Sequence, residues 1–283
     1  MSELQRTPGR AAPAATAAAR LLLPALVVLA WAVVLVQPRA GPPLFSAEAW
    51  ARVGGFVSRL AGMGIPGEAA FARGSSWASI AGQALTTLSL SVLAAGLAGS
   101  AALLTVHLAA RPGAEGPPAR LPRRALGACV RGAYVLARSI PELVWALLMV
   151  LVLRPSPLAA ALALGIHNAG VLGRLLTDVV EDLDPRPARA LAATGAGAAQ
   201  AFLYGALPRM LPQVLTFVLY RWEVIIRTTV IVEAVTGTGM GSALRFALSG
   251  REFTTVTVVL TAYVALVLAV DLLSAILRRT IRG

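Results

Sequence analysis

Charged side chains that lie inside long apolar runs are the residues of this sequence best suited to chemistry. Arg138 and Glu142 share one run, and Arg221, Glu223 and Arg227 share a later one. An ionised group at the centre of a bilayer costs at least about 2.5–3.5 kcal/mol, so each of the five needs a charged partner or a water-filled pathway. Guanidinium groups bind oxyanions through paired N–H donors. The five are therefore our candidate pathway residues, with Arg138 and Arg227 as the anion-binding groups.

The alternative is that these charges neutralise one another and are only structural. Residues four apart lie on one face of a helix. This spacing would pair Arg138 with Glu142 and Arg227 with Glu223. Two polar residues of another apolar run, His167 and Asn168, are similarly open to two interpretations, a hydrogen bond between helices or a substrate contact.

Catalytic and metal sites are poorly supported. The two histidines, His107 and His167, are far apart in the sequence, and the single cysteine, Cys129, cannot form an intramolecular disulfide. The sequence contains no lysine, so it cannot build a Walker A loop. The glycine-rich run 237–241 has no lysine after it and is interpreted as a turn before a short helix over 242–250. We expect no catalytic residue, metal or cofactor on this chain, and any ATP and Mg²⁺ would be bound by another chain.

The composition is that of a membrane protein. Hydrophobic residues make up 57% of the 283 and charged residues 13%, and the mean hydropathy is +0.75. Soluble domains carry about 25% charged residues, so lipid must replace water over much of this surface. The net charge of +12 could suggest nucleic acid. The arginines instead separate apolar runs, which indicates membrane topology and no nucleic-acid partner.

Six apolar runs approach the length of about 20 residues that a spanning helix needs. We predict an all-α membrane protein with a single transmembrane domain over 1–283 and spans at 17–36, 80–109, 132–153, 157–176, 211–235 and 254–277. The first run could also be a signal peptide, but no small-residue cleavage site follows it, which favours a retained span. Placing both termini in the cytoplasm puts 15 arginines inside and 7 outside, in line with the positive-inside rule.

The segment 177–210 is a long cytoplasmic loop in this topology. Pro185 and Pro187 suit the start of a helix, and the alanine-rich run after them favours helix. Gly195 and Gly197 would end it before a second short helix over 198–204. Two short helices with a glycine hinge could dock a partner, and the alternative is a merely amphipathic surface loop.

This loop resembles the cytoplasmic signature of bacterial ABC importer permeases, E-A-A-x-x-x-G followed after nine residues by I-x-L-P. Three residues depart from the pattern: Arg189 for Glu, Leu191 for Ala and Gly205 for Ile. The residues that match the signature positions are Arg189, Ala190, Leu191, Gly195, Gly205, Leu207 and Pro208. The resemblance implies a type I importer-permease fold in which this loop couples to an ATPase. Without the Glu we do not rely on any particular salt bridge to the ATPase, but the docking role of the helix is still expected.

Three further stretches resemble permeases for phosphonate. They are SIPELVWALL at 139–148, the run 220–244 through the glycine-rich turn, and VDLLSAILRR near the C-terminus. The resemblance covers roughly 125–279. It implies a subunit that imports phosphonate, phosphate or phosphite by alternating access in a bacterial inner membrane. It also implies two ATPase subunits that bind ATP and Mg²⁺, an extracytoplasmic binding protein, and a second permease, identical or similar.

Other functions remain open. The chain could be an importer permease for another small solute. A secondary transporter is the next alternative, but such proteins typically show two repeated halves, and none is visible here. A membrane enzyme would need a cluster of catalytic side chains that the sequence does not provide.

Overall fold

The computed structural model describes residues 22, 24–33, 46–64, 67–110 and 121–282, and these contain helices and no strand. The chain falls into two units, residues 1–57 and 58–283. In the first unit, the described part of the predicted span 17–36 contains the short apolar helix Pro24–Val33, and most of α2 (Ala47–Leu60) follows. The rest of that predicted span lies outside the described residues.

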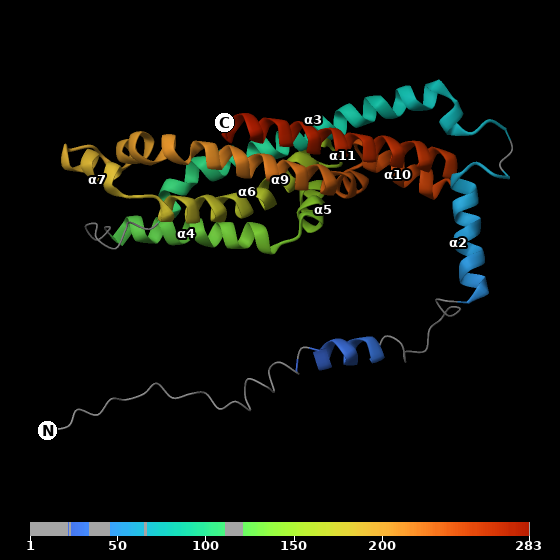
Figure 1. Ribbon diagram of the computed structural model, residues 1–283, viewed down its shortest axis with the longest axis horizontal. Coiled ribbons are helices and arrows are strands. Elements are labelled where there is room, and N and C mark those ends of the chain that lie inside the picture. The colour runs from blue at the N-terminus through green and yellow to red at the C-terminus, as the bar shows by residue number, and fades with distance from the viewer. Residues whose placement is uncertain (1–21, 23, 34–45, 65–66, 111–120, 283) are drawn as a thin grey trace. The chain divides into compact units, whose positions relative to one another are not determined.

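The second unit is a bundle built on four long helices, α3 (Gly74–Ala109), α6 (Pro157–Asp182), α9 (Leu207–Thr236) and α11 (Phe253–Arg282), which Figure 1 shows running beside one another. Figure 1 also shows α7 at one end of this bundle and α10 towards the other. The shorter elements are η1 (Ala70–Ala72), α4 (Leu121–Ser139), α5 (Glu142–Leu153), α7 (Arg186–Ala193), α8 (Ala198–Gln200), the π-helical η2 (Ala201–Ala206) and α10 (Gly239–Ser249).

Helix α6 is the centre of the bundle and contacts α3, α4, α5 and α9. Small residues allow these close approaches, as is usual where helices associate in membranes. At Gly170 an added Cβ would lie 2.8 Å from the Cβ of Ala137, and at Gly173 it would collide with the ring of Tyr134. Ser156 begins the helix by accepting a hydrogen bond from the N–H of Ala159 at 3.2 Å.

The predicted span 132–153 is wrong as a single straight helix. The chain forms α4 and α5 instead, with an angle of 98° between them. The break falls at Ile140 and Pro141. A proline has no N–H for the helical ladder, and it disfavours the helical conformation of the residue before it. The pair is thus a broken span or a re-entrant loop.

The other predicted spans overlap single helices with shifted ends. Among the described residues, α3, α6 and α11 are long and apolar enough to cross a membrane, and the bent pair α4–α5 would be a fourth. Helix α9 covers the predicted span 211–235, but it carries too many Arg and Glu residues to count as an apolar spanning helix. Six spans therefore stay a prediction.

The predicted loop 177–210 is shorter than expected, because α6 continues to Asp182 and α9 begins at Leu207. Between them lie α7, a turn at Gly195 in the left-handed region (φ 91°), and η2. The two short helices with a glycine turn are confirmed, although the second is largely a π-helix. We call residues 183–206 the α7–η2 segment.

The contact of Tyr134 with Gly173 gives a stability test. We expect Gly173→Val to destabilise the protein by about 1–3 kcal/mol, because the added methyl groups overlap the Tyr134 ring and separate α4 from α6. The melting temperature of detergent-purified protein, followed by size-exclusion chromatography, measures the effect. Gly132→Val on α4 is the control, since an added Cβ there meets no atom within 4 Å. Equal losses from the two variants would contradict this packing.

Candidate functional site

Two charged residues of α9, Arg227 and Glu223, are paired with charges of α11. Arg227 donates two hydrogen bonds to the carboxylate of Asp271, at 2.7 and 2.6 Å, and the pair is partly exposed, 47% and 34%. Glu223 pairs with Arg278, whose guanidinium group lies 4.1 Å above the ring of Tyr220. The predicted pairing of Arg227 with Glu223 is therefore wrong. Helix α11 lies against α9 and offers both residues an opposite charge, which competes with the weak pairing along one helix.

The break between α4 and α5 is bound to α6 through His167. The ring Nδ1 lies 2.9 Å from the carbonyl oxygen of Ile140, and Nε2 lies 3.3 Å from Oε2 of Glu142. The predicted pairing of Arg138 with Glu142 is also wrong, because the 98° bend places them on different helices. Arg138 is exposed at the end of α4.

Arg221 is held next to this break. Its Nε donates to Oδ1 of Asn168 at 2.6 Å, and the Asn168 amide in turn donates to the carbonyl oxygen of Leu164 at 2.7 Å. Asn168 is 1% exposed, so its orientation is fixed. Glu142 joins this group through its contact with His167, the residue before Asn168. We call Glu142, His167, Asn168 and Arg221 the break cluster.

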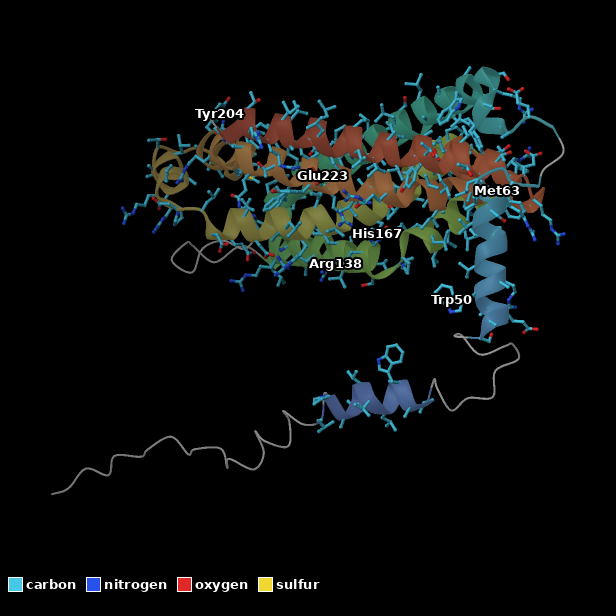
Figure 2. The ribbon with its side chains drawn as sticks, turned by 45° about the vertical axis from the view of Figure 1, so that its right-hand side comes forward. Trp50, Met63, Arg138, His167, Tyr204 and Glu223 are labelled. Carbon is cyan, nitrogen blue, oxygen red and sulfur yellow. The ribbon has the colours of Figure 1, made fainter. Side chains whose placement is uncertain are left out.

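Of the five predicted pathway residues, the structure brings two, Glu142 and Arg221, into the break cluster, and it joins Glu223 and Arg227 to α11. His167 and Asn168 complete the cluster. Each makes the hydrogen bond between helices that was one of the two interpretations open for it. Figure 2 places Arg138, His167 and Glu223 in the middle part of the bundle, away from Tyr204 at one end and Met63 at the other.

A second polar cluster anchors α10. Glu233 is fully buried, and its Oε2 accepts hydrogen bonds from Thr87 at 2.8 Å and from the N–H of Gly241 at 3.1 Å. Thr87 also accepts from the N–H of Met240. The glycine-rich run leads into a short helix, as predicted, but α10 begins at Gly239, so only residues 237 and 238 form the turn before it. The sequence signal for the role of Glu233 is an acidic residue within an apolar helix, just before a glycine-rich turn.

The signature residues gather in and beside the α7–η2 segment. Arg189, Ala190 and Leu191 lie on α7, and Leu207 and Pro208 begin α9. Gly195 ends α7 with φ 91°, a conformation that glycine adopts without strain. Gly205 packs against Ala188, where an added Cβ would lie 3.0 Å from the Cα of that alanine. The segment is therefore a compact unit between the end of α6 and the start of α9.

The part of the sequence that contains α4 to α11 matches a known family. The model of the binding-protein-dependent transport system inner membrane component matches residues 114–283. The chain belongs to this family. The permease is accordingly a multi-pass inner-membrane component of a transport system and not an enzyme. The side of the membrane on which its termini lie stays a prediction.

Two relatives come from Stutzerimonas stutzeri. The permease is 34% identical over 162 residues to the putative phosphite transport system permease protein HtxE, covering 57% of this chain and 62% of that protein. It is 30% identical over 223 residues to the phosphite transport system permease protein PtxC, covering 79% and 77%. A third, the putative cryptic phosphonate transport system permease protein PhnE2 of Escherichia coli K12, is 36% identical over 42% of this chain and 97% of its own length.

The fold is shared with solved ABC transporters. The permease superposes on a chain of the MetNI methionine ABC transporter in an inward-facing conformation with a TM-score of 0.58, over 71% of this chain and 95% of that chain, at 18% identity. An amino acid ABC transporter gives a TM-score of 0.53 over 69% and 91%, also at 18% identity. The predicted type I importer-permease fold is confirmed.

The pair between Arg227 and Asp271 gives a test of mutual neutralisation. We expect Arg227→Gln and Asp271→Asn each to lower the melting temperature, because each leaves one charge without its partner inside the membrane. The double variant should recover most of the loss, since it leaves neither charge unpaired. Melting temperatures of the three purified variants and wild type measure the coupling. Losses that simply add in the double variant would contradict the pairing.

Proposed function

We propose that this chain is the membrane-spanning subunit of an ATP-driven importer and forms the pathway for a phosphorus oxyanion, either phosphite, phosphonate or phosphate. The observation that carries the proposal is the match along 79% of the chain to a permease named for phosphite. A relative from Mycolicibacterium smegmatis named as a phosphate-import permease protein, PhnE, supports the same group of substrates.

The energy for transport comes from other chains. The sequence has no lysine for a Walker A loop, so ATP and Mg²⁺ would be bound by separate ATPase subunits. The α7–η2 segment is our proposed docking site for them. Helix α7 is mostly exposed and packs against η2, and η2 continues directly into α9. The family description supports a binding protein that delivers the substrate. A second permease would complete the pathway, which would open alternately to the two sides.

The charge of the described helices suits an anion. Arg221 is partly exposed beside the break between α4 and α5, and Arg138 is exposed at the end of α4. A guanidinium group presents several N–H donors in a plane, which matches the oxygens of a phosphorus oxyanion. Arg227 is a less favourable candidate than Arg138 or Arg221, because two of its hydrogen bonds already go to Asp271.

The function can be tested on the assembled transporter. The tagged chain is purified from its own membranes in a mild detergent, and the eluate is assayed for ATP hydrolysis. Proteoliposomes that contain the complex and its binding protein are then assayed for uptake of phosphite, phosphate and methylphosphonate. We expect ATP-dependent uptake of at least one of the three. Uptake without any co-purified ATPase would favour a secondary transporter, and ATP-dependent uptake of none of them would favour another solute.

The contact of Gly205 with Ala188 tests the coupling role of the α7–η2 segment. We expect Gly205→Val to lower the uptake per ATP hydrolysed, because the added side chain pushes α7 away from η2 and from the start of α9. Gly197→Val is the control within the segment, since an added Cβ there meets only Gln200 at 3.9 Å. Uptake per ATP is measured in the same proteoliposomes. An unchanged ratio in Gly205→Val would contradict this role.

A further inference from the structure

Helix α2 has two faces of different character. With 3.6 residues per turn, its large apolar residues fall on one side of the helix and its charged residues on the other. The apolar side consists of Trp50, Val53, Phe56, Val57 and Leu60, and the polar side carries Glu48, Arg52 and Arg59. Such a division indicates a helix that lies along a boundary between an apolar and a polar environment.

The apolar side of α2 is exposed. Trp50 is 63% exposed and Val57 56%, and no residue of the helix is buried. Figure 2 shows the Trp50 side chain projecting from the helix. The adjacent glycines Gly54 and Gly55 each cost a helix about 1 kcal/mol relative to alanine. A short helix with this sequence is marginal in water alone, so it needs something to cover its apolar side.

The last turn of α2 lies beside the start of α11. The guanidinium carbon of Arg59 is 5.5 Å from the ring centre of Phe253, the first residue of α11. One turn further on, the hydroxyl group of Thr257 donates a hydrogen bond of 2.8 Å to the carbonyl oxygen of Leu60. These two contacts fix the end of α2 at the level where α11 begins.

The start of α11 marks the surface of the membrane. This helix is apolar and long enough to cross a bilayer, and most of it is not buried within the bundle. The two residues directly before it, Arg251 and Glu252, are charged and exposed. Charged groups are costly within the hydrocarbon layer and favoured outside it. The boundary between lipid and water therefore lies near Phe253, and so does the end of α2.

We propose that α2 is an interfacial helix whose apolar side is inserted in lipid at the membrane surface. Trp50 would lie at the headgroup level, where its apolar ring and polar N–H are both satisfied. Arg52 on the opposite side would face the lipid phosphates. The occupant of the exposed side is thus the same lipid that covers the apolar residues of α11. The inference goes beyond the proposed function and holds for any transported solute.

A second copy of the chain or the binding protein is the alternative occupant. A protein partner would exclude both lipid and water from the apolar side of α2, whereas a lipid surface excludes water alone. Molecular oxygen dissolves in the hydrocarbon layer, and a charged nickel chelate stays in the water. The access of these two reagents to a spin label therefore distinguishes lipid, water and protein as the surroundings of each residue.

The experiment uses the purified transporter complex in vesicles of phosphatidylcholine and phosphatidylglycerol. The exposed Cys129 is first replaced by Cys129→Ser, and single nitroxide labels are then attached through introduced cysteines. We expect labels on the apolar side to collide mainly with oxygen, at a depth of about 5–10 Å, and labels on the polar side to collide mainly with the nickel chelate. The labelled variants are Trp50→Cys, Val53→Cys and Val57→Cys on the apolar side, and Glu48→Cys and Arg52→Cys on the polar side.

A matched pair of charge variants tests the insertion directly. Val53→Asp places a charge on the apolar side and should move the label at position 57 towards water. Ala51→Asp places the same charge on the opposite side and should leave the depth of that label unchanged. Equal access of the nickel chelate to both sides, or low access of both reagents to the apolar side, would overturn the inference. Failure of the proposed function is separate, because it appears in the uptake assay and not in these labels.

Discussion

A charge inside a bilayer has to be compensated within the protein, and here the compensation comes largely from neighbouring helices. Asp271 and Arg278 of α11 neutralise Arg227 and Glu223 of α9, and His167 of α6 contacts Glu142 of α5. These contacts fix how the helices are aligned along their axes. A helix that slid by one turn, about 5.4 Å, would leave several charges without partners. The polar contacts therefore select one alignment of the apolar helices, whereas contact with lipid would not favour one alignment over another.

Small residues provide the second constraint, because they bring the polar groups within reach. Gly170 and Gly173 allow α4 to lie directly on α6, which places the end of α4 beside His167. The break at Pro141 then exposes the carbonyl oxygen of Ile140, and His167 binds it. Proline alone would leave a loose bend. The close approach and the hydrogen bond together make the bend a defined feature of the fold.

The sequence predicted the helical class, the approximate helix positions, the α7–η2 segment and the turn before α10. It also contained the signal for the break, since Pro141 lies inside the predicted span 132–153 and disfavours a helical Ile140. The ion pairs between helices could not be predicted from the sequence. The spacing of residues is enough to predict a pair along one helix, but a pair between two helices also depends on how the helices are aligned. Arg227 and Asp271 are 44 residues apart, and nothing in the sequence sets α11 at that height against α9.

Helix α9 connects the features that the proposed function needs. It follows the α7–η2 segment and carries Arg221 and Arg227 in its middle part. Its last turn contains Glu233, which accepts a hydrogen bond from the first turn of α10. Thirty residues of helix span about 45 Å, so one rigid element joins the proposed ATPase contact to the opposite end of the bundle. The π-helix at its start is a place where a helix can adjust without unfolding. Arg221 belongs to α9 and is hydrogen-bonded to Asn168 of α6, so it links the two helices. A displacement of α7 by a partner would therefore reach the break cluster through α9.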